Sequence, residues 1–165
     1  MSSDDIEGIG TVSIREVDDS VPRPQSPSEY DDWGEMVQEA AALRIAHWLI
    51  EFTKPTGEVI PVGNLSGHSV WYGPTAGSRA MNIGINLLDT HRGFGIGAIA
   101  QRLLAEELHN QGIVRVEAQT DVENIPEQRA LNKAGFAYEG TLRKAQSRRS
   151  GVHDIQVWSH IGMAE

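Results

Sequence analysis

The feature of this sequence that most constrains its fold is the segment Arg92–Gly97, in which three glycines alternate with other residues. The preceding run Ala80–Leu88 alternates apolar and polar residues and predicts a β-strand. After the glycines, isoleucine and leucine recur at helical spacing up to Gly112, and Ile113–Thr120 alternates again as a strand. The order strand, glycine loop, helix, strand indicates an α/β unit.

A glycine loop between a strand and a helix is suited to binding an anion. Glycine lacks a Cβ atom, so successive backbone N–H groups can converge on one ligand, and the helix N-terminus adds positive potential. Arg92 supplies a charged donor there, and a diphosphate group matches this set of donors. A purely structural turn would explain the spacing alone equally well. A P-loop is excluded because Gly-Lys-Ser/Thr is missing, and a dinucleotide fold requires different glycine spacing after the first parallel strand.

The first half of the chain predicts an antiparallel meander interrupted by one helix. Residues 1–10 are polar and acidic and are expected to be flexible, and Thr11–Val17 alternates as the first strand. A proline-rich run follows, and apolar residues at helical spacing then predict a helix over about Ser28–Leu43. The alternating runs Ala46–Phe52 and Val59–Leu65 form a hairpin around a Lys-Pro-Thr-Gly turn.

The C-terminal part predicts one short helix and two closing strands. The helix over Ile125–Ala134 ends at Gly135, and the strands are Phe136–Leu142 and Val152–His160. Hydrophobic residues make up 39% of the chain, which is enough to bury one core without disulfides or a structural metal. We therefore expect a single domain over residues 11–165.

The composition excludes several functions. The 165 residues include no cysteine, which excludes a disulfide scaffold, a thiolate zinc site and an acyl-cysteine intermediate. No histidine is paired with carboxylates at a metal-binding spacing, so no metal is expected. A formal net charge of −9 opposes nucleic acid binding and favours cationic substrates such as amines, although it also serves solubility. With no apolar leader and no run of about 20 apolar residues, we expect a cytoplasmic protein without a membrane partner.

Several motifs, in order along the chain, resemble those of the GNAT acetyltransferases. Arg92–Gly97 matches the family signature Gln/Arg-x-x-Gly-x-Gly/Ala, and Asn124–Phe136 resembles its Asn-led helix ending in Gly-Phe. Glu139–Arg143 is similar to the next strand, and Gly151–Asp154 is similar to the ending of the ribosomal-protein branch, called Rim-type. The resemblance covers about Ala80–His160. It implies an α/β (α+β) fold with a mixed, mostly antiparallel sheet, a central splayed pair of parallel strands and flanking helices.

The resemblance also implies acetyl-CoA as the acyl donor, lying between parallel strands that end near Leu88 and Thr120. The residues it assigns to the cofactor are Leu87 and Leu88 through their main chain, Arg92, Gly93, Phe94, Gly95, Ile96, Gly97 and Ala98 at the diphosphate, and Asn124 beside the cofactor arm. A second interpretation of Asn124 needs no ligand, because Asn124 and Glu127 also form a capping box for the following helix. Both interpretations stay open.

A base must take a proton from the acceptor amine, and a carboxylate near the strand gap is expected to do so. Glu117 is the first candidate because it lies on the strand that borders the cofactor, and a solvated strand glutamate is the alternative. Glu127 is the second candidate. Many family members carry a tyrosine acid at the position of Leu131, and leucine cannot donate a proton. Rim-type members usually lack this tyrosine too, but they carry serine at the position of Glu127. The group that protonates the departing thiolate is therefore not identified. The alternative is that catalysis rests mainly on holding the two reactants close together and on polarisation of the thioester carbonyl by strand amides.

Substrate contacts are expected from the early helix, the hairpin and the stretch Gly67–Ser78. His68, Trp71 and Tyr72 cluster there, and they either line an acceptor pocket or plug the loop. The expected function is acetyl transfer to a primary amine of a protein N-terminus or a small molecule, by direct attack in a ternary complex on a monomer or homodimer. A catalytically silent acetyl-CoA-binding regulator and a nucleotide-phosphate binder of unrelated fold are the alternatives.

Overall fold

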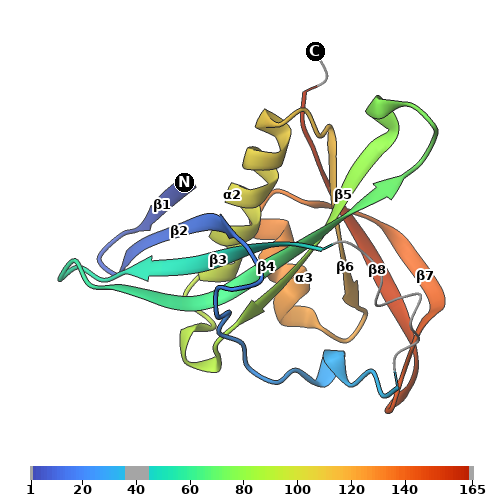
Figure 1. Ribbon diagram of the computed structural model, residues 1–165. Coiled ribbons are helices and arrows are strands. Elements are labelled where there is room, and N and C mark those ends of the chain that lie inside the picture. Colours follow the sequence, from blue (N-terminus) through green and yellow to red (C-terminus); the bar gives the residue numbers. More distant parts are fainter. Residues whose placement is uncertain (1, 36–44, 164–165) are drawn as a thin grey trace.

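The computed structural model describes residues 2–35 and 45–163, which form one eight-stranded sheet in the order β1-β2-β3-β4-β5-β6-β8-β7 (Figure 1). The strands are β1 (Ser2–Ile6), β2 (Gly10–Val17), β3 (Ala46–Thr53), β4 (Val59–Trp71), β5 (Arg79–Leu87), β6 (Arg115–Asp121), β7 (Ala137–Arg148) and β8 (Gly151–Ile161). The helices are α2 (Ile96–Asn110) and α3 (Ile125–Lys133), with the short 3-10 turns η1 (Glu29–Asp31), η2 (Ala76–Ser78) and η3 (Asp89–His91). Among these strands only β5 and β6 are parallel neighbours, which confirms the expected fold class.

The helix expected over about Ser28–Leu43 falls largely on residues 36–44, which lie outside the described residues. Within the described part, Ser28 does cap a helical turn. Its hydroxyl oxygen accepts a hydrogen bond from the backbone N–H of Tyr30 at 3.2 Å, at the start of η1.

The N-terminal residues differ from the expected flexible segment, because β1 pairs with β2 along its whole length. The chain turns at Gly8, whose φ of 71° lies in the left-handed region. Two contacts to α2 hold the strand: Ser2 donates to Glu107 at 3.3 Å, and Asp4 forms an ion pair with Arg102. Because β1 is an edge strand with mostly exposed polar residues, it lacks the apolar alternation that would have predicted it.

The parallel pair of strands splits halfway along its length. Strands β5 and β6 are paired only from Met81–Val116 to Ile83–Ala118, and beyond this point no pairing joins the two strands. Strand β4 also bends near this end, since the register shift between Ile50 and Glu51 leaves Val62 as an extra residue in β4. The sheet therefore opens a gap between the C-terminal ends of β5 and β6.

The two faces of the sheet are covered differently. The helix face carries the main core, in which Ile83 and Ala118 pack with leucines of α2 and with Leu131 of α3. Side chains alternate between the two faces along each strand, so the neighbouring residues Asn82 and Glu117 point to the other face.

That second face is crossed by the proline-rich segment between β2 and η1, so we call it the strap face (Figure 1). Asn64 of β4 donates to the Pro24 carbonyl at 3.0 Å, and Asn86 of β5 exchanges two hydrogen bonds with the backbone of Ser26, at 2.9 and 3.0 Å. Proline removes backbone donors and fixes φ, which suits an extended segment held by side chains of the sheet.

Candidate functional site

The glycine loop joins η3 to α2, and its three glycines are needed for different reasons. Gly93 and Gly95 both have φ of 85°, and a Cβ atom at either would meet nothing within 4 Å. Backbone conformation therefore selects glycine at these two positions. Gly97 is instead selected by packing, because a Cβ there would lie 3.3 Å from the Leu87 side chain. The loop is thus open to solvent at its turn and tightly packed where α2 begins.

The loop presents a row of free backbone donors. The first N–H bonded at the start of α2 is that of Ile99, which donates to the Gly95 carbonyl at 3.1 Å. The N–H groups of residues 93–98 have no hydrogen-bond partner among the described residues, and no side chain caps the helix. Phe94 is 54% exposed, whereas Ile96 and Ala98 are buried and anchor the helix start. Six free amides at a helix N-terminus can bind an anion such as a diphosphate.

Arg92 holds this loop against the end of β5. Its guanidinium donates to the Leu87 carbonyl from Nε at 3.2 Å and from Nη2 at 3.1 Å, and Nη1 pairs with Asp89 at 2.8 Å. The side chain is 46% exposed, so part of its charge faces solvent beside the free amides. Arg92 is therefore both a clamp for the loop and a charged neighbour of the anion site.

The main chain just after β5 concerns one expected cofactor contact, Leu88, which stays a prediction. The N–H of Leu88 donates to the Val62 carbonyl at 2.9 Å, and its carbonyl accepts from the His91 N–H at 2.9 Å. Both main-chain groups of Leu88 are therefore engaged within the protein. Since backbone groups alternate in direction along a strand, Ile85 and Leu87 direct theirs toward the gap, although the Leu87 carbonyl already accepts from Arg92. Ile85 was missed by sequence reasoning, because strand register is not visible in the sequence.

Asn124 acts as a helix cap in the structure. Its side-chain oxygen accepts a hydrogen bond from the N–H of Glu127 at 3.3 Å, at the N-terminus of α3. The cap by Asn124 is therefore confirmed, whereas the Asn124 N–H donates to the Asp121 carbonyl at 3.0 Å and not to the Glu127 side chain, as a full capping box would require. The expected contact of Asn124 with a cofactor stays a prediction.

Glu117 lies at the point where the strands split and is 1% exposed, on the strap face. The Tyr72 hydroxyl donates to it at 2.8 Å, and Arg115 donates from Nε at 2.9 Å. Glu117 is thus a buried member of an ion pair, which excludes the solvated alternative. Burial and the bond to Glu117 raise the pKa of Tyr72.

The same arginine extends this network to the next strands. Arg115 makes two bonds to Glu139, at 2.8 and 2.6 Å, and the Ser159 hydroxyl donates to Glu139 at 2.6 Å. The bonds from Arg115 and Ser159 lower the pKa of Glu139 to about 2. A pocket of about 400 Å³ lies beside this network, lined in part by Tyr72, Arg79 and Arg115.

Glu127 lies on the other side of the sheet, on the helix that packs against α2. Its side chain is half-buried. Burial raises the pKa of Glu127 to about 7, and the nearby Gln101 amide opposes the shift only in part. The two candidate catalytic acids therefore occupy opposite faces and are not brought together.

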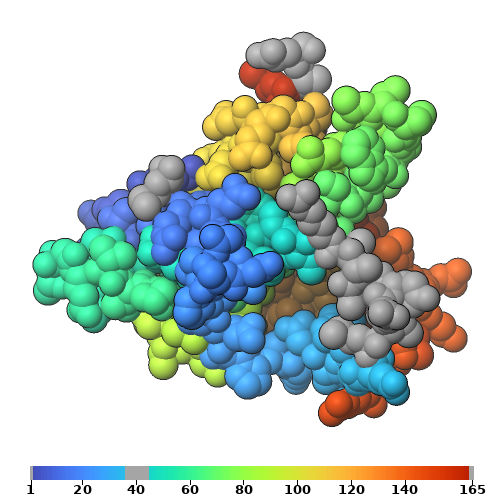
Figure 2. Space-filling model, viewed as in Figure 1, coloured from blue at the N-terminus to red at the C-terminus, as the bar shows by residue number. Residues whose placement is uncertain are grey.

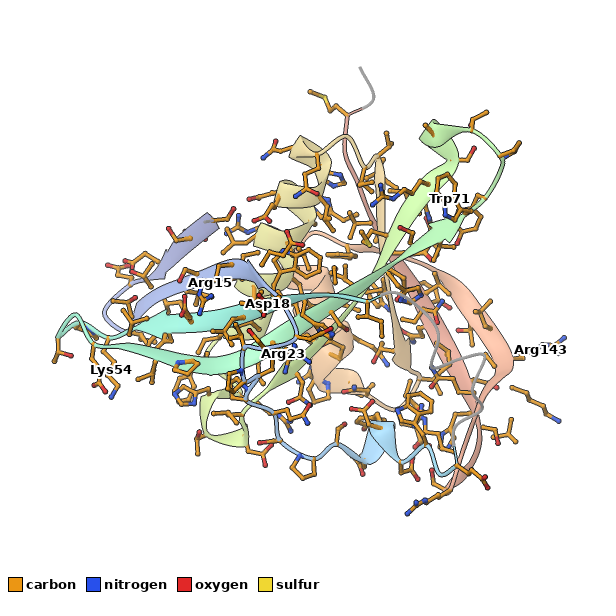
Figure 3. All side chains as sticks on the ribbon, viewed as in Figure 1. Arg15, Asp18, Arg23, Lys54, Trp71 and Arg143 are labelled. Carbon is orange, nitrogen blue, oxygen red and sulfur yellow. The ribbon has the colours of Figure 1, made fainter. Side chains whose placement is uncertain are left out.

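The three expected substrate residues are only partly brought together. Tyr72 reaches Glu117, whereas Trp71 is 58% exposed on the hairpin of β4 and β5, which projects from the body of the molecule (Figures 2 and 3). His68 lies further down β4, opposite Asn82. A pocket lined by all three is not formed by the described residues, and Tyr72 alone joins the site.

A second network, at the C-terminal end of β6, was not predicted. Asp121 is 2% exposed and accepts from Arg148 at 2.7 Å, and His153 lies 3.0 Å from the same carboxylate oxygen. Arg148 also stacks 5.8 Å from the rings of Tyr30 and Trp33. These residues come from four separate segments, so no local pattern could have indicated their contact.

The described residues bring no three His, Cys, Asp or Glu side chains together in a way that could hold a metal ion. In the same part of the chain, no helix has the length and apolar character needed to cross a membrane.

These features define a class of protein: a mixed α/β sheet whose parallel strands split beside a glycine loop and the free N-terminus of a helix. Within this class, the model of the acetyltransferase (GNAT) domain family matches residues 1–137. The chain therefore belongs to the GNAT acetyltransferase family, as the motifs at residues 92–97 and 124–136 predict.

Three proteins illustrate the similarity. Phosphinothricin N-acetyltransferase of Streptomyces viridochromogenes is 24% identical over 135 residues, covering 82% of this chain and 68% of the relative. RimJ of Mycobacterium smegmatis, solved in complex with CoA-disulfide, has a TM-score of 0.59 and 25% identity over 72% of this chain. The microcin C7 self-immunity acetyltransferase MccE, in complex with acetyl-CoA and AMP, has a TM-score of 0.60 and 23% identity, covering 72% of this chain and 61% of MccE. The similarity to RimJ supports the Rim-type branch, although the chain spans only 54% of the length of RimJ.

Proposed function

We propose that this chain is an acetyl-CoA-dependent N-acetyltransferase that moves an acetyl group to a primary amine. The observation that carries the proposal is the row of N–H groups at residues 93–98, unpartnered among the described residues at the open end of the split strands. Backbone donors without a protein partner bind water or a ligand, and a helix start favours an anion. The complexes of RimJ and MccE support a coenzyme A thioester as that ligand.

The cofactor follows a path set by the split. Its diphosphate lies on the glycine loop, and its pantetheine arm runs along the backbone groups of Ile85 and the N–H of Leu87, while the Leu87 carbonyl is held by Arg92. The thioester then reaches the point where pairing resumes, at Ile83 and Ala118. Asn124 lies beside this path because α3 begins soon after the end of β6.

The amine approaches from the strap face and attacks the thioester carbonyl directly in a ternary complex. A C–N bond forms, the C–S bond breaks, and coenzyme A leaves as a thiolate that is then protonated. Glu117 accepts the proton that the amine loses, and Tyr72 lines the approach because its hydroxyl already contacts this carboxylate. Holding both reactants at the split supplies the proximity that the reaction needs.

The acceptor is an amine of a protein N-terminus or of a small molecule, with His68 and Trp71 as further candidate contacts. The net charge of −9 supports a cationic acceptor and argues against a nucleic acid partner. The proposal includes a monomer or homodimer that works in the cytoplasm, and the absence of cysteine is in keeping with a reducing compartment.

Replacing Gly95 by Ala tests the phosphate site. A side chain at φ 85° strains the loop and turns its amides away from a common point, so coenzyme A affinity should fall at least about tenfold. Gly57→Ala is the matched control, because Gly57 has φ of 87° and equally open surroundings in the turn between β3 and β4. Isothermal titration calorimetry with coenzyme A measures both variants. Equal affinities for the two would contradict the proposed site.

Turnover separates the enzyme from a silent regulator. Release of free thiol from acetyl-CoA, measured over a panel of amines and N-terminal peptides, should depend on the amine offered. Tight cofactor binding without thiol release for any amine would favour the regulator. In an active protein, Glu117→Gln should lower kcat, and an unchanged pH profile of kcat in that variant would exclude Glu117 as the proton acceptor.

A further inference from the structure

Three hydrogen-bonded side chains form a continuous chain at the turn between β7 and β8, beside η1 (Figure 1). The Ser150 hydroxyl lies 2.9 Å from His153 Nε2, and His153 Nδ1 lies 3.0 Å from Asp121 Oδ2. None of these side chains takes part in the proposed acetyl transfer. A serine, a histidine and an aspartate linked in this order are the parts of a nucleophilic triad, which is recognised by geometry and not by position in the sequence.

Asp121 sets the direction of the two hydrogen bonds. An ionised carboxylate only accepts hydrogen bonds, so a neutral His153 must carry its proton on Nδ1 and donate it to Asp121. Nε2 is then the nitrogen with a free lone pair, and the Ser150 hydroxyl must donate to it. In this tautomer His153 can accept the hydroxyl proton and activate the serine oxygen.

Both ends of this chain are held by other contacts. Asp121 is 2% exposed, its Oδ1 accepts from the N–H of Glu123 at 2.8 Å, and its Oδ2 also accepts from Arg148 at 2.7 Å. The backbone N–H of Ser150 donates to the Asp32 carboxylate at 3.0 Å, which ties the turn to the segment that follows η1. The imidazole between the two ends is therefore oriented before any reagent arrives.

The reactive end of the chain faces solvent, whereas its charged end is buried. Ser150 is exposed and the His153 side chain is 20% exposed, but the side chains of Asp121 and Arg148 are each 1% exposed. Because Arg148 shares the charge of Asp121, the carboxylate acts mainly by fixing the tautomer and orientation of His153. The Ser150 N–H is engaged by Asp32 and does not stabilise an oxyanion, so activation rests on His153, and a positioned base contributes about 100- to 10,000-fold.

We infer that Ser150 is a nucleophilic serine that accepts an acyl group from activated esters, with His153 as its base and Asp121 as a positioning residue. Ser150 Oγ forms a C–O bond with the ester carbonyl carbon while the hydroxyl proton passes to His153 Nε2. The bond from that carbon to the leaving oxygen breaks, and His153 returns the proton to this oxygen. With an acetate ester the product is O-acetyl-Ser150. The reaction needs no coenzyme A and is independent of the proposed function.

The probe is p-nitrophenyl acetate, added to the whole chain without coenzyme A. Samples are quenched in acid at successive times, and mass spectrometry of proteolytic peptides gives the rate at which each serine is acetylated. Ser20 is the matched control within the same chain, since it is also exposed in a turn but its hydroxyl donates to the Asp18 carboxylate rather than to a histidine. His153→Gln removes the base, and circular dichroism shows whether this variant keeps the native fold.

In the folded wild type, Ser150 should be acetylated at least about 100-fold faster than Ser20. In concentrated urea, where the three segments separate, the two serines should react at similar rates, which needs no variant. His153→Gln should react at Ser150 about as slowly as at Ser20. A Ser150 that reacts no faster than Ser20 in the folded wild type would overturn the inference, as would an undiminished rate in folded His153→Gln. Either result would leave the proposed function intact.

Nitrogen-15 NMR of the His153 imidazole tests the positioning role of Asp121 without a reagent. The neutral ring should carry its proton on Nδ1 in the wild type. Asp121→Ala combined with Arg148→Met removes the carboxylate without leaving a buried charge, and should abolish this preference and slow acetylation of Ser150 at least about tenfold. A proton on Nε2 in the wild type, or an unchanged tautomer and rate in the double variant, would exclude Asp121 as the positioning residue.

Discussion

Glu117 on β6 and Glu127 on α3 are both shielded from water, yet their surroundings differ completely. Glu117 is 1% exposed, lies on the strap face and accepts hydrogen bonds from Arg115 and Tyr72. Glu127 is less buried and lies on the helix face, and no charged side chain among the described residues shifts its pKa. The more deeply buried acid keeps an ionic partner, and the less buried acid has its pKa raised to about 7. An arginine lies beside Glu117, whereas burial raises the pKa of Glu127 and no cation opposes the shift.

The contrast has a chemical use in an acyl transfer. Under the proposed function, a carboxylate on the strap face can accept the proton that the amine loses. The following experiments test how the surroundings of each acid affect the stability of the protein.

The largest effect is expected from removing the cation next to Glu117. Arg115→Met leaves a buried carboxylate with Tyr72 as its remaining donor, and should destabilise the protein by about 3 to 4 kcal/mol. The double variant Arg115→Met with Glu117→Gln has no buried charge and should recover at least half of this loss. Urea unfolding followed by circular dichroism measures both. A double variant as unstable as the single one would show that packing of Arg115, and not its charge, matters.

A smaller effect of opposite sign is expected for Glu127. Folding raises the pKa of Glu127 from its ordinary 4.5 to about 7, so the wild type loses stability as pH rises from about 4.5 to about 7. Glu127→Gln removes this loss and should stabilise the apo protein by about 2 kcal/mol at pH 8, with little effect at pH 4.5. Thermal unfolding at both pH values measures the difference. An equal change at both would show that the effect is unrelated to the charge of Glu127.

Local patterns predicted the parts of this site that are contiguous in sequence. The glycine loop, its flanking strand and helix, and the Asn124 cap of α3 are each encoded within a few residues, and the structure contains all of them. The reciprocal bond of the expected capping box is not formed, because the Asn124 N–H donates to the Asp121 carbonyl at 3.0 Å. The backbone conformation of Gly93 and Gly95 explains why this motif can be recognised in the sequence, since only glycine adopts that conformation easily.

Properties that depend on strand register could not be predicted. The direction of the backbone groups of Ile85 and Leu88 follows from the pairing of β5 with β4, which a single sequence does not reveal. The same holds for the contact of Tyr72 with Glu117, because 45 residues separate them. The edge strand β1 was missed because its polar composition avoids the pattern by which strands are recognised.

The smallest effect is expected at the cap of α3, where the two interpretations of Asn124 can be separated. Asn124→Ala removes the bond to the Glu127 N–H and should destabilise the protein by about 1 kcal/mol. Asn124→Ser keeps a side-chain oxygen that can cap the helix but lacks the amide, so stability should stay near wild type. If the amide also contacts the cofactor arm, coenzyme A affinity should fall in both variants. If Asn124→Ser binds coenzyme A as tightly as the wild type, Asn124 serves the site only by fixing the start of α3, and through it the position of Glu127.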